Sequence, residues 1–229
     1  MKRKCTSCFI RNHASPFSMK KTFLGAGIIL SVSLILITSC LPQPTEKERQ
    51  KIRYQPQPGT TWHWQLTGIL NTSHDAEVYD LDLETTPQEI IDELHAKGKK
   101  VICYFSAGTV ELFRRDAEQF PQKTIGWQLK DWPGERWLDV RSYKQFARIM
   151  EKRFDLAVKK KCDGIEADNV DAYQQDTGFP ITYEDQLKYN RWLAEQAHKR
   201  NLSIGLKNDL GQVKDLVDSF DFAVNEQCF

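Results

Sequence analysis

The sequence predicts an α/β fold of the (β/α)8 class, a TIM barrel, on three observations. Short apolar runs alternate with longer amphipathic segments from Thr61 onward, an order that implies parallel strands joined by right-handed crossovers. No glycine-rich phosphate loop follows the first run, which disfavours an open dinucleotide-binding sheet. Polar residues gather where the strands end, as they do on the barrel rim that carries active sites in this fold.

Seven strands are expected in this part of the chain, each a short apolar run. In chain order they are TWHWQLTG (61–68), AEVYDLDL (76–83), KVICYFSAG (100–108), RWLDV (136–140), DGIEADNVD (163–171), LSIGLKN (202–208) and DFAVNEQCF (221–229). The visible part of the barrel therefore has seven of its eight strands.

Helices are expected between these strands. Thr86 can cap a helix that has Pro87 at its first position, and Gly98 can end it. Thr182, with Asp185 three residues later, can open a second helix that runs through residue 200. Between the fourth and fifth strands, apolar residues fall at helical spacing on one face: Phe146, Ile149, Met150, Phe154 and Ala157.

The N-terminal part is typical of a secretion signal. From Met19, two lysines precede an apolar stretch from Phe23 to Ile37, which is shorter than the ~20 residues of a membrane-spanning helix. The ending ITSC resembles a bacterial lipoprotein site, which implies cleavage before Cys40 and a lipid on its sulfur; an ordinary signal peptide with an incidental cysteine is the alternative. We interpret residues 19–40 as the signal and residues 1–18 as a mis-assigned extension.

Composition changes after the signal. Residues 41–60 are rich in proline, glutamine and charge and predict a disordered tether, followed by one domain over residues 61–229. Residues 1–60 hold 10 Lys and Arg against 2 Asp and Glu, which leaves 22 basic and 29 acidic residues in the domain, a net charge of −7. This charge disfavours nucleic acid as a partner and is compatible with a cationic one.

Polar side chains stand at the C-terminal ends of most predicted strands. They are Asp80, Asp82, Tyr104, Ser106, Asp139, Glu166, Asp168, Lys207, Asn208, Asn225 and Glu226. Because a barrel brings all of these strand ends to one rim, carboxylates from separate strands are expected to converge on one site.

Seven strand-end segments occur in a fixed order over residues 62–229: WQL at 64, YDLDL at 79, CYFSAG at 103, WLDV at 137, GIEADNVDAY at 164, GLKN at 205 and NEQCF at 225. Together they resemble glycoside hydrolase family 114, the endo-α-1,4-polygalactosaminidase family. The resemblance implies a barrel enzyme that cuts inside galactosamine-containing polysaccharides.

The resemblance also places the catalytic carboxyl groups at Asp168, in the DN step, and at Glu226, in NEQ. Glycosidic cleavage generally uses two such groups. We expect Asp168 to be the nucleophile and Glu226 the acid/base, giving retention, which requires carboxyls ~5–5.5 Å apart, against ~6.5–9.5 Å for inversion. Glu166 is the rival for the fifth-strand role, because it lies two residues from Asp168 and faces the same side of an extended strand.

Other strand-end residues are expected to bind substrate: Asp82, Tyr104, Asp139, Glu166, Tyr173, Lys207 and Asn208. Asp82 and Asp139 can pair with the ammonium of a protonated amino sugar, or they can be rim carboxylates bound to backbone amides or to Arg141. The two tyrosines can stack on sugar rings or serve packing. Lys207 and Asn208 can orient the acid/base.

The tryptophans and cysteines allow several interpretations. Trp62, Trp64, Trp127, Trp132 and Trp137 suggest a sugar platform, with core packing explaining at least half of them. Cys103 is expected to be a small buried hydrophobe. Cys162 and Cys228 could pair in an oxidising envelope.

The seventh strand reaches Phe229 and a closed barrel needs an eighth, so the domain is expected to be incomplete at its C-terminus. The alternative function is a non-catalytic sugar-binding envelope lipoprotein derived from such an enzyme; the presence of both carboxylates favours the enzyme. No cofactor or metal is implied. We expect a monomer in the bacterial cell envelope, lipid-anchored or secreted, whose partner is a polysaccharide.

Overall fold

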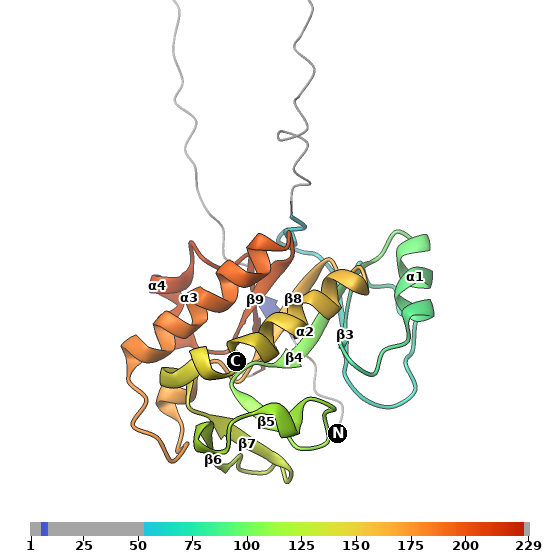
Figure 1. Cartoon of the computed structure of the whole chain (residues 1–229). Helices are drawn as coiled ribbons and strands as arrows, with labels where there is room; N and C mark the ends of the chain where they lie inside the picture. Colours follow the sequence, from blue (N-terminus) through green and yellow to red (C-terminus); the bar gives the residue numbers. More distant parts are fainter. Residues whose placement is uncertain (1–5, 9–52, 227–229) are drawn as a thin grey trace, which may run out of the picture. The chain divides into compact units, whose positions relative to one another are not determined.

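The computed structural model describes residues 6–8 and 53–226, in which helices cover a parallel sheet (Figure 1). The strands are β1 (Thr6–Cys8), β2 (Trp62–Gln65), β3 (Val78–Asp82), β4 (Lys100–Ser106), β5 (Thr109–Glu111), β6 (Ile125–Gln128), β7 (Glu135–Leu138), β8 (Gly164–Asp168), β9 (Ser203–Lys207) and β10 (Phe222–Asn225). The α-helices are α1 (Gln88–Ala96), α2 (Ala147–Lys159), α3 (Tyr183–Lys199) and α4 (Val213–Leu216). Short 3-10 segments are η1 (Ala117–Gln119), η2 (Gln122–Thr124), η3 (Val140–Gln145), η4 (Ala172–Gln174) and η5 (Leu210–Gln212).

The main sheet has the order β1-β10-β9-β8-β4-β3-β2, in which β2, β3, β4, β8, β9 and β10 run parallel. The sheet is curled. This is seen from the hydrogen bond that the Trp64 side chain on β2 donates to Glu166 on β8, although β3 and β4 lie between these two strands. The described residues thus form a curled parallel half-barrel, in agreement with the predicted α/β class.

The fourth predicted strand is not part of this sheet, which corrects the expectation of seven barrel strands. Residues 135–138 form β7 of a separate antiparallel sheet with the order β5-β7-β6, seen at the bottom of Figure 1. The turn between β6 and β7 contains Asp131 and Gly134 at positive φ, 66° and 88°. The sequence WPG in this turn is a hairpin signal that favours antiparallel pairing over a crossover strand.

Two segments expected to lie outside the fold make contacts with it. Residues 6–8 pair antiparallel with β10, with Thr6 opposite Asn225. The tether is expected to extend to residue 60, but Gln55 donates a 3.0 Å hydrogen bond to Asp221 Oδ1, and Tyr54 packs against the cluster of Val78, Ile102, Phe222 and Val224. The ordered domain therefore begins by residue 53, because these contacts offset the entropy of fixing the chain.

The predicted helices are confirmed, with one change of capping. The side chain of Thr182 accepts a hydrogen bond from the amide of Asp185, and the carboxylate of Asp185 accepts one from the amide of Thr182. These two bonds are the predicted capping box of α3. At α1 the N-cap is Pro87 and no side chain caps it, so the Thr86 cap is wrong. Instead, the carbonyl of Thr86 accepts a 2.7 Å bond from Lys160.

A disulfide joins Cys103 on β4 to Cys162 before β8, with the Cα atoms 6.0 Å apart. This corrects both cysteine expectations: Cys103 is not a free hydrophobe, and the partner of Cys162 is not Cys228, which lies outside the described residues. Strand order explains the error, because β4 and β8 are adjacent in the sheet although the cysteines are 59 residues apart in sequence.

Reduction of this disulfide should lower the free energy of unfolding by roughly 4 kcal/mol, the chain-entropy value for a loop of this length. Urea unfolding with and without reductant measures the change. A Cys103→Ala/Cys162→Ala double variant is the control and should not respond to reductant. An unchanged midpoint for wild-type protein whose thiols have been shown to be free would contradict the prediction.

The described residues contain no helix that is both long enough and apolar enough to cross a membrane. The predicted signal, residues 19–40 with Cys40, lies outside the described residues, as do residues 227–229.

Candidate active site

Three neighbouring strands of the main sheet deliver the groups at the centre of the site. Glu166 and Asp168 are on β8, Lys207 ends β9, and Glu226 directly follows β10. The side chain of Glu166 is fully buried, that of Asp168 is 18% exposed and that of Glu226 is 32% exposed. The predicted convergence of strand-end carboxylates therefore occurs for these three acids.

The ammonium of Lys207 holds this group together. Its Nζ lies 3.0 Å from Asp168 Oδ1, 3.2 Å from Glu166 Oε1 and 4.0 Å from Glu226 Oε2. Burial acts to lower the pKa of Lys207, but the three carboxylates around it outweigh that effect and leave the pKa well above its ordinary value. Lys207 is therefore a fixed positive charge between the carboxylates, not a group that orients Glu226 alone.

The two more exposed carboxylates, Asp168 and Glu226, both lie within 4.0 Å of Lys207 Nζ. Because Lys207 Nζ is 3.0 Å from Asp168 Oδ1 and 4.0 Å from Glu226 Oε2, these two oxygens are at most about 7 Å apart, a range that includes the ~5–5.5 Å of a retaining pair and the lower end of the ~6.5–9.5 Å of an inverting pair. Glu166 has a different environment, since Trp64 Nε1 donates to its Oε2 at 2.9 Å and Lys207 occupies its other oxygen.

Tyr104 contacts Asp168, and Asn208 contacts Glu226. The Tyr104 hydroxyl donates a 3.0 Å hydrogen bond to Asp168 Oδ2; burial, and then the charge of Asp168, hold the pKa of Tyr104 well above its ordinary value. Asn208 lies at a φ of 52°, in the left-handed region that asparagine tolerates. Its Nδ2 donates to Glu226 Oε2 at 3.4 Å, and its Oδ1 accepts from the Glu226 amide at 3.2 Å.

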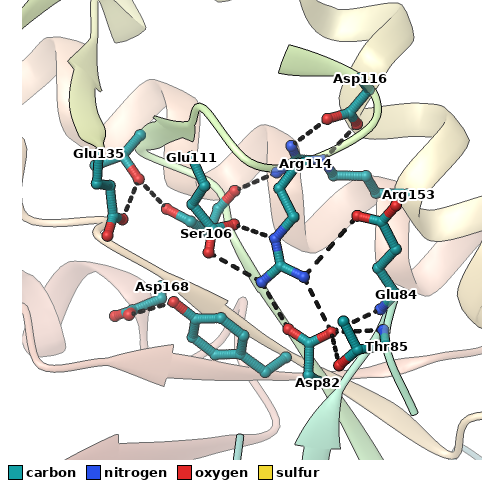
Figure 2. A network of polar contacts seen from close by, with 12 residues as sticks. Asp82, Glu84, Thr85, Ser106, Glu111, Arg114, Asp116, Glu135, Arg153 and Asp168 are labelled. Atoms are coloured by element: carbon teal, nitrogen blue, oxygen red, sulfur yellow. Dashed lines mark hydrogen bonds and ion pairs between the residues drawn. The ribbon is translucent and has the colours of Figure 1, made fainter. Parts of the chain in front are cut away.

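Asp82 is held by other partners. It accepts from Arg114 Nη1 at 2.9 Å and Nη2 at 2.6 Å, and from the amide of Thr85 at 2.7 Å. Figure 2 shows Arg114 between Asp82, Glu84 and Glu111. Burial acts to raise the pKa of Asp82, but these bonds outweigh it and the pKa is lowered. With 4% of Asp82 exposed, these contacts favour a structural role over recognition of an amino sugar.

Asp139 also has a structural partner, the alternative that the sequence left open. Its Oδ1 accepts from Arg141 Nε at 2.7 Å, and its Oδ2 accepts from Arg141 Nη2 at 3.0 Å and from Ser142 at 3.2 Å. Because Asp139 follows β7, it belongs to the small sheet and not to an end of the parallel strands.

Tyr173 lies in a second acidic cluster that sequence reasoning missed. Burial, and then the charge of Asp209, raise the pKa of Tyr173 to about 12. Burial raises the pKa of Asp209 itself to about 8, and the charge of Asp171 adds to the shift. Asn190 donates a 2.9 Å bond to Asp209 Oδ2. Asp171 lies three residues after Asp168, so the position of this cluster near Asp168 could have been expected. The hydrogen bond from Asn190 on α3 to Asp209 could not.

The tryptophans separate by environment. Trp137 is 4% exposed and packs in the core, and Trp62 packs against Phe222 with ring centroids 5.5 Å apart. Trp64 holds Glu166, a role that sequence reasoning did not identify. Trp127 and Trp132 are 57% and 61% exposed. Residues 6–8 and 53–226 contain no group of three or more His, Cys, Asp and Glu side chains placed to bind a metal.

Comparisons with known proteins identify the family and the fold of this chain. The sequence profile described as glycoside-hydrolase family GH114 matches residues 43–229. The crystal structure of Ega3 from Aspergillus fumigatus, in complex with galactosamine, is 43% identical with a TM-score of 0.75; the match covers 77% of this chain and 70% of that one. A search of curated proteins gave no significant match.

A second solved structure is similar in fold. The glycoside hydrolase domain of PelA from Pseudomonas aeruginosa matches with a TM-score of 0.51 at 14% identity, over 68% of this chain and 62% of that one. At this identity the likeness concerns the fold alone.

Proposed function

The chain belongs to the glycoside-hydrolase family GH114 and is a glycosidase, and on that premise we propose that it hydrolyses internal α-1,4 linkages of a galactosamine-containing polysaccharide. Asp168 is the nucleophile and Glu226 the acid/base. The observation that carries this proposal is the pair of partly exposed carboxylates that flank the buried ammonium of Lys207.

Exposure supports Asp168 over Glu166 as the nucleophile. A nucleophile must touch the anomeric carbon, and the Glu166 side chain is 0% exposed with its two oxygens facing Trp64 and Lys207. Asp168 keeps 18% of its side chain exposed and is oriented by Tyr104. Glu166 is therefore assigned a supporting role, as a second counter-charge that keeps Lys207 in place.

The proposed reaction has two steps. Asp168 attacks the anomeric carbon while Glu226 donates its proton to the leaving oxygen, so the glycosidic bond breaks as a covalent glycosyl-enzyme forms. The glutamate, now a carboxylate, then removes a proton from water, which attacks the same carbon and releases Asp168. The product retains its anomeric configuration. The bound of about 7 Å on the distance from Asp168 Oδ1 to Glu226 Oε2 is compatible with this route.

A cationic polymer is the proposed substrate. The domain carries 22 basic and 29 acidic residues, and a net negative protein attracts a positively charged chain. The structure of Ega3 holds galactosamine, a sugar whose free amine is protonated at neutral pH. We place the protein in the cell envelope or outside the cell, because residues 19–40 resemble a lipoprotein signal and the Cys103–Cys162 disulfide suits an oxidising compartment.

The full chain should release a ladder of oligosaccharides early in the digestion of partially deacetylated poly-α-1,4-galactosamine. The fully N-acetylated polymer, which lacks the positive charges, should be cleaved more slowly. Mass spectrometry of early products measures both. Monosaccharide as the first product would contradict internal cleavage, and binding without cleavage would favour a non-catalytic sugar-binding lipoprotein.

A further inference from the structure

The backbone that carries Asp168 is held by the end of the neighbouring strand. The amides of Ala107 and Gly108 donate to the carbonyl of Asp168 at 2.9 and 3.1 Å. Asn169 follows at a φ of 59°. A Cβ atom added at Gly108 would overlap the carbonyl of Asn169, so the two turns are in direct backbone contact. The position of Asp168 thus depends on a tight turn at residues 168 and 169.

The side chain of Asn169 ties this turn to the small sheet. Its Nδ2 donates to Ser106 Oγ at 2.9 Å and to Glu135 Oε1 at 3.0 Å. Thr109 also donates to Glu135 Oε1 and shares a hydrogen bond with Ser106. Ser106 and Thr109 are 0% exposed and Glu135 is 7% exposed. Figure 2 shows Glu135 and Ser106 on the side of the network that faces Asp168.

The buried carboxyl group of Glu135 is unfavourable for stability by itself. Burying it carries a desolvation penalty that an apolar residue would avoid, and burial raises the pKa of Glu135, with the charges of Glu111 and Asp168 adding to the shift. In the described structure Oε1 of Glu135 accepts from both Thr109 and Asn169. That oxygen fixes the Asn169 amide, and through it the turn that begins at the proposed nucleophile.

We propose that Glu135 is a positioning residue for glycoside cleavage, which acts on Asp168 through the side chain of Asn169. The inference rests on the proposed function of Asp168. It also gives the small sheet a role in the reaction, because Glu135 is the first residue of β7. Glu135 does not touch the substrate. It affects the position of the Asp168 carboxylate relative to the substrate, and a misplacement of about 1 Å can lower the rate on the order of 100-fold.

Four variants of the full chain test this proposal on partially deacetylated poly-α-1,4-galactosamine. Glu135→Leu removes the accepting oxygen, and Asn169→Gly removes the donor while tolerating the positive φ. Each should lower kcat by about 10- to 100-fold with KM changed less than about threefold. Glu135→Gln keeps an accepting Oε1 and should retain kcat within about threefold of wild type. The Glu135→Leu/Asn169→Gly double variant should be no slower than the slower single variant, because both remove the same link.

Glu111→Gln is the matched control. Glu111 is also a buried carboxylate of the small sheet, but it binds Arg114, at 2.8 and 2.9 Å, and not Asn169. It should lose stability to thermal unfolding and keep the kcat of wild type. Circular dichroism establishes that each variant is folded, and if Glu135→Leu does not fold, Asn169→Gly and Glu135→Gln still decide the outcome.

Wild-type kcat in folded Asn169→Gly or Glu135→Leu would overturn the proposal, as would multiplicative losses in the double variant or a loss confined to KM. The proposed function fails separately, if wild-type protein does not cleave the polymer or Asp168→Asn does. A cleaving wild type, an inactive Asp168→Asn and an unimpaired Glu135→Leu would refute the role of Glu135 alone.

Discussion

Replacement of Asp168 by asparagine should lower kcat for polymer cleavage by a factor on the order of 10³ to 10⁵, the loss typical of removing a nucleophile. Asparagine is nearly the same size. Its amide oxygen can still accept from Lys207, which contacts Asp168 Oδ1 at 3.0 Å, and its NH2 group can donate to the Tyr104 hydroxyl, which contacts Oδ2 at 3.0 Å. The fold should therefore persist, so that the loss reports chemistry. Release of reducing ends at saturating polymer measures kcat.

Glu226→Gln separates the two roles. It should abolish polymer cleavage, because the sugar leaving group needs a proton. On an aryl galactosaminide whose phenol leaves without protonation, the first step should recover in Glu226→Gln and stay blocked in Asp168→Asn. Recovery in Asp168→Asn but not in Glu226→Gln would reverse the assignment.

Glu166 supplies the control for the choice between neighbouring acids. Glu166→Gln keeps an oxygen for the indole of Trp64 and removes one counter-charge from Lys207. It should lose less activity than Asp168→Asn. An inactive Glu166→Gln together with an active Asp168→Asn would make Glu166 the nucleophile.

Lys207→Met should lower the free energy of unfolding by about 3–5 kcal/mol, the cost of leaving buried charge without its partner. The Lys207 side chain is 3% exposed and that of its partner Glu166 is 0% exposed, so water does not replace the ammonium beside Glu166. Activity should fall as well, because Asp168 loses the cation 3.0 Å from its Oδ1. Thermal unfolding and polymer cleavage measure the two effects.

The pH dependence of this contribution follows from the sign of the shift. The pKa of Lys207 is raised in the folded protein, where burial opposes the rise and the surrounding carboxylates outweigh it. A raised lysine pKa stabilises the fold at pH values below the ordinary lysine pKa, and that stability is lost as pH rises through the folded value. The difference between wild type and Lys207→Met should therefore persist from neutral pH to about pH 10.

Lys199→Met is the matched control for Lys207→Met. Lys199 pairs with Glu195 at 2.7 Å, but both side chains are 58% exposed, and such surface pairs contribute little to stability. If Lys207→Met unfolds at the same temperature as Lys199→Met, the buried ammonium does not hold the site together.

The convergence of Glu166, Asp168 and Glu226 was predictable, because strand-end position in a parallel sheet depends on local patterns. Each residue ends or follows an apolar run, and the alternation of strands and helices brings those ends together. The capping box of Thr182 and Asp185 was predictable for the same reason: its bonds span three residues. The position of Lys207 at a strand end could be expected, but its three carboxylate contacts could not.

Features made by pairing across long sequence distances were missed. The run RWLDV (136–140) predicts a barrel strand because it is apolar and short, yet the pairing of β7 with β5 and β6 places it in another sheet. Asp82 is expected at the substrate because the sequence does not reveal its cation: Arg114 lies 32 residues beyond it. The cation of Asp139 is local, since Arg141 lies two residues away, and the sequence offers that pairing as an alternative. The sequence does not predict the disulfide between Cys103 and Cys162. Strands β4 and β8 are adjacent only because the predicted strand RWLDV lies in the other sheet.

The catalytic roles of Asp168 and Glu226 are tested by reducing-end release from partially deacetylated poly-α-1,4-galactosamine by the full chain, beside its Asp168→Asn and Glu226→Gln forms. We expect cleavage by wild type and its loss in both variants, each still folded and still binding the polymer. Equal cleavage by all three proteins would contradict the assignment of Asp168 and Glu226. No cleavage by wild type would contradict the proposed function itself.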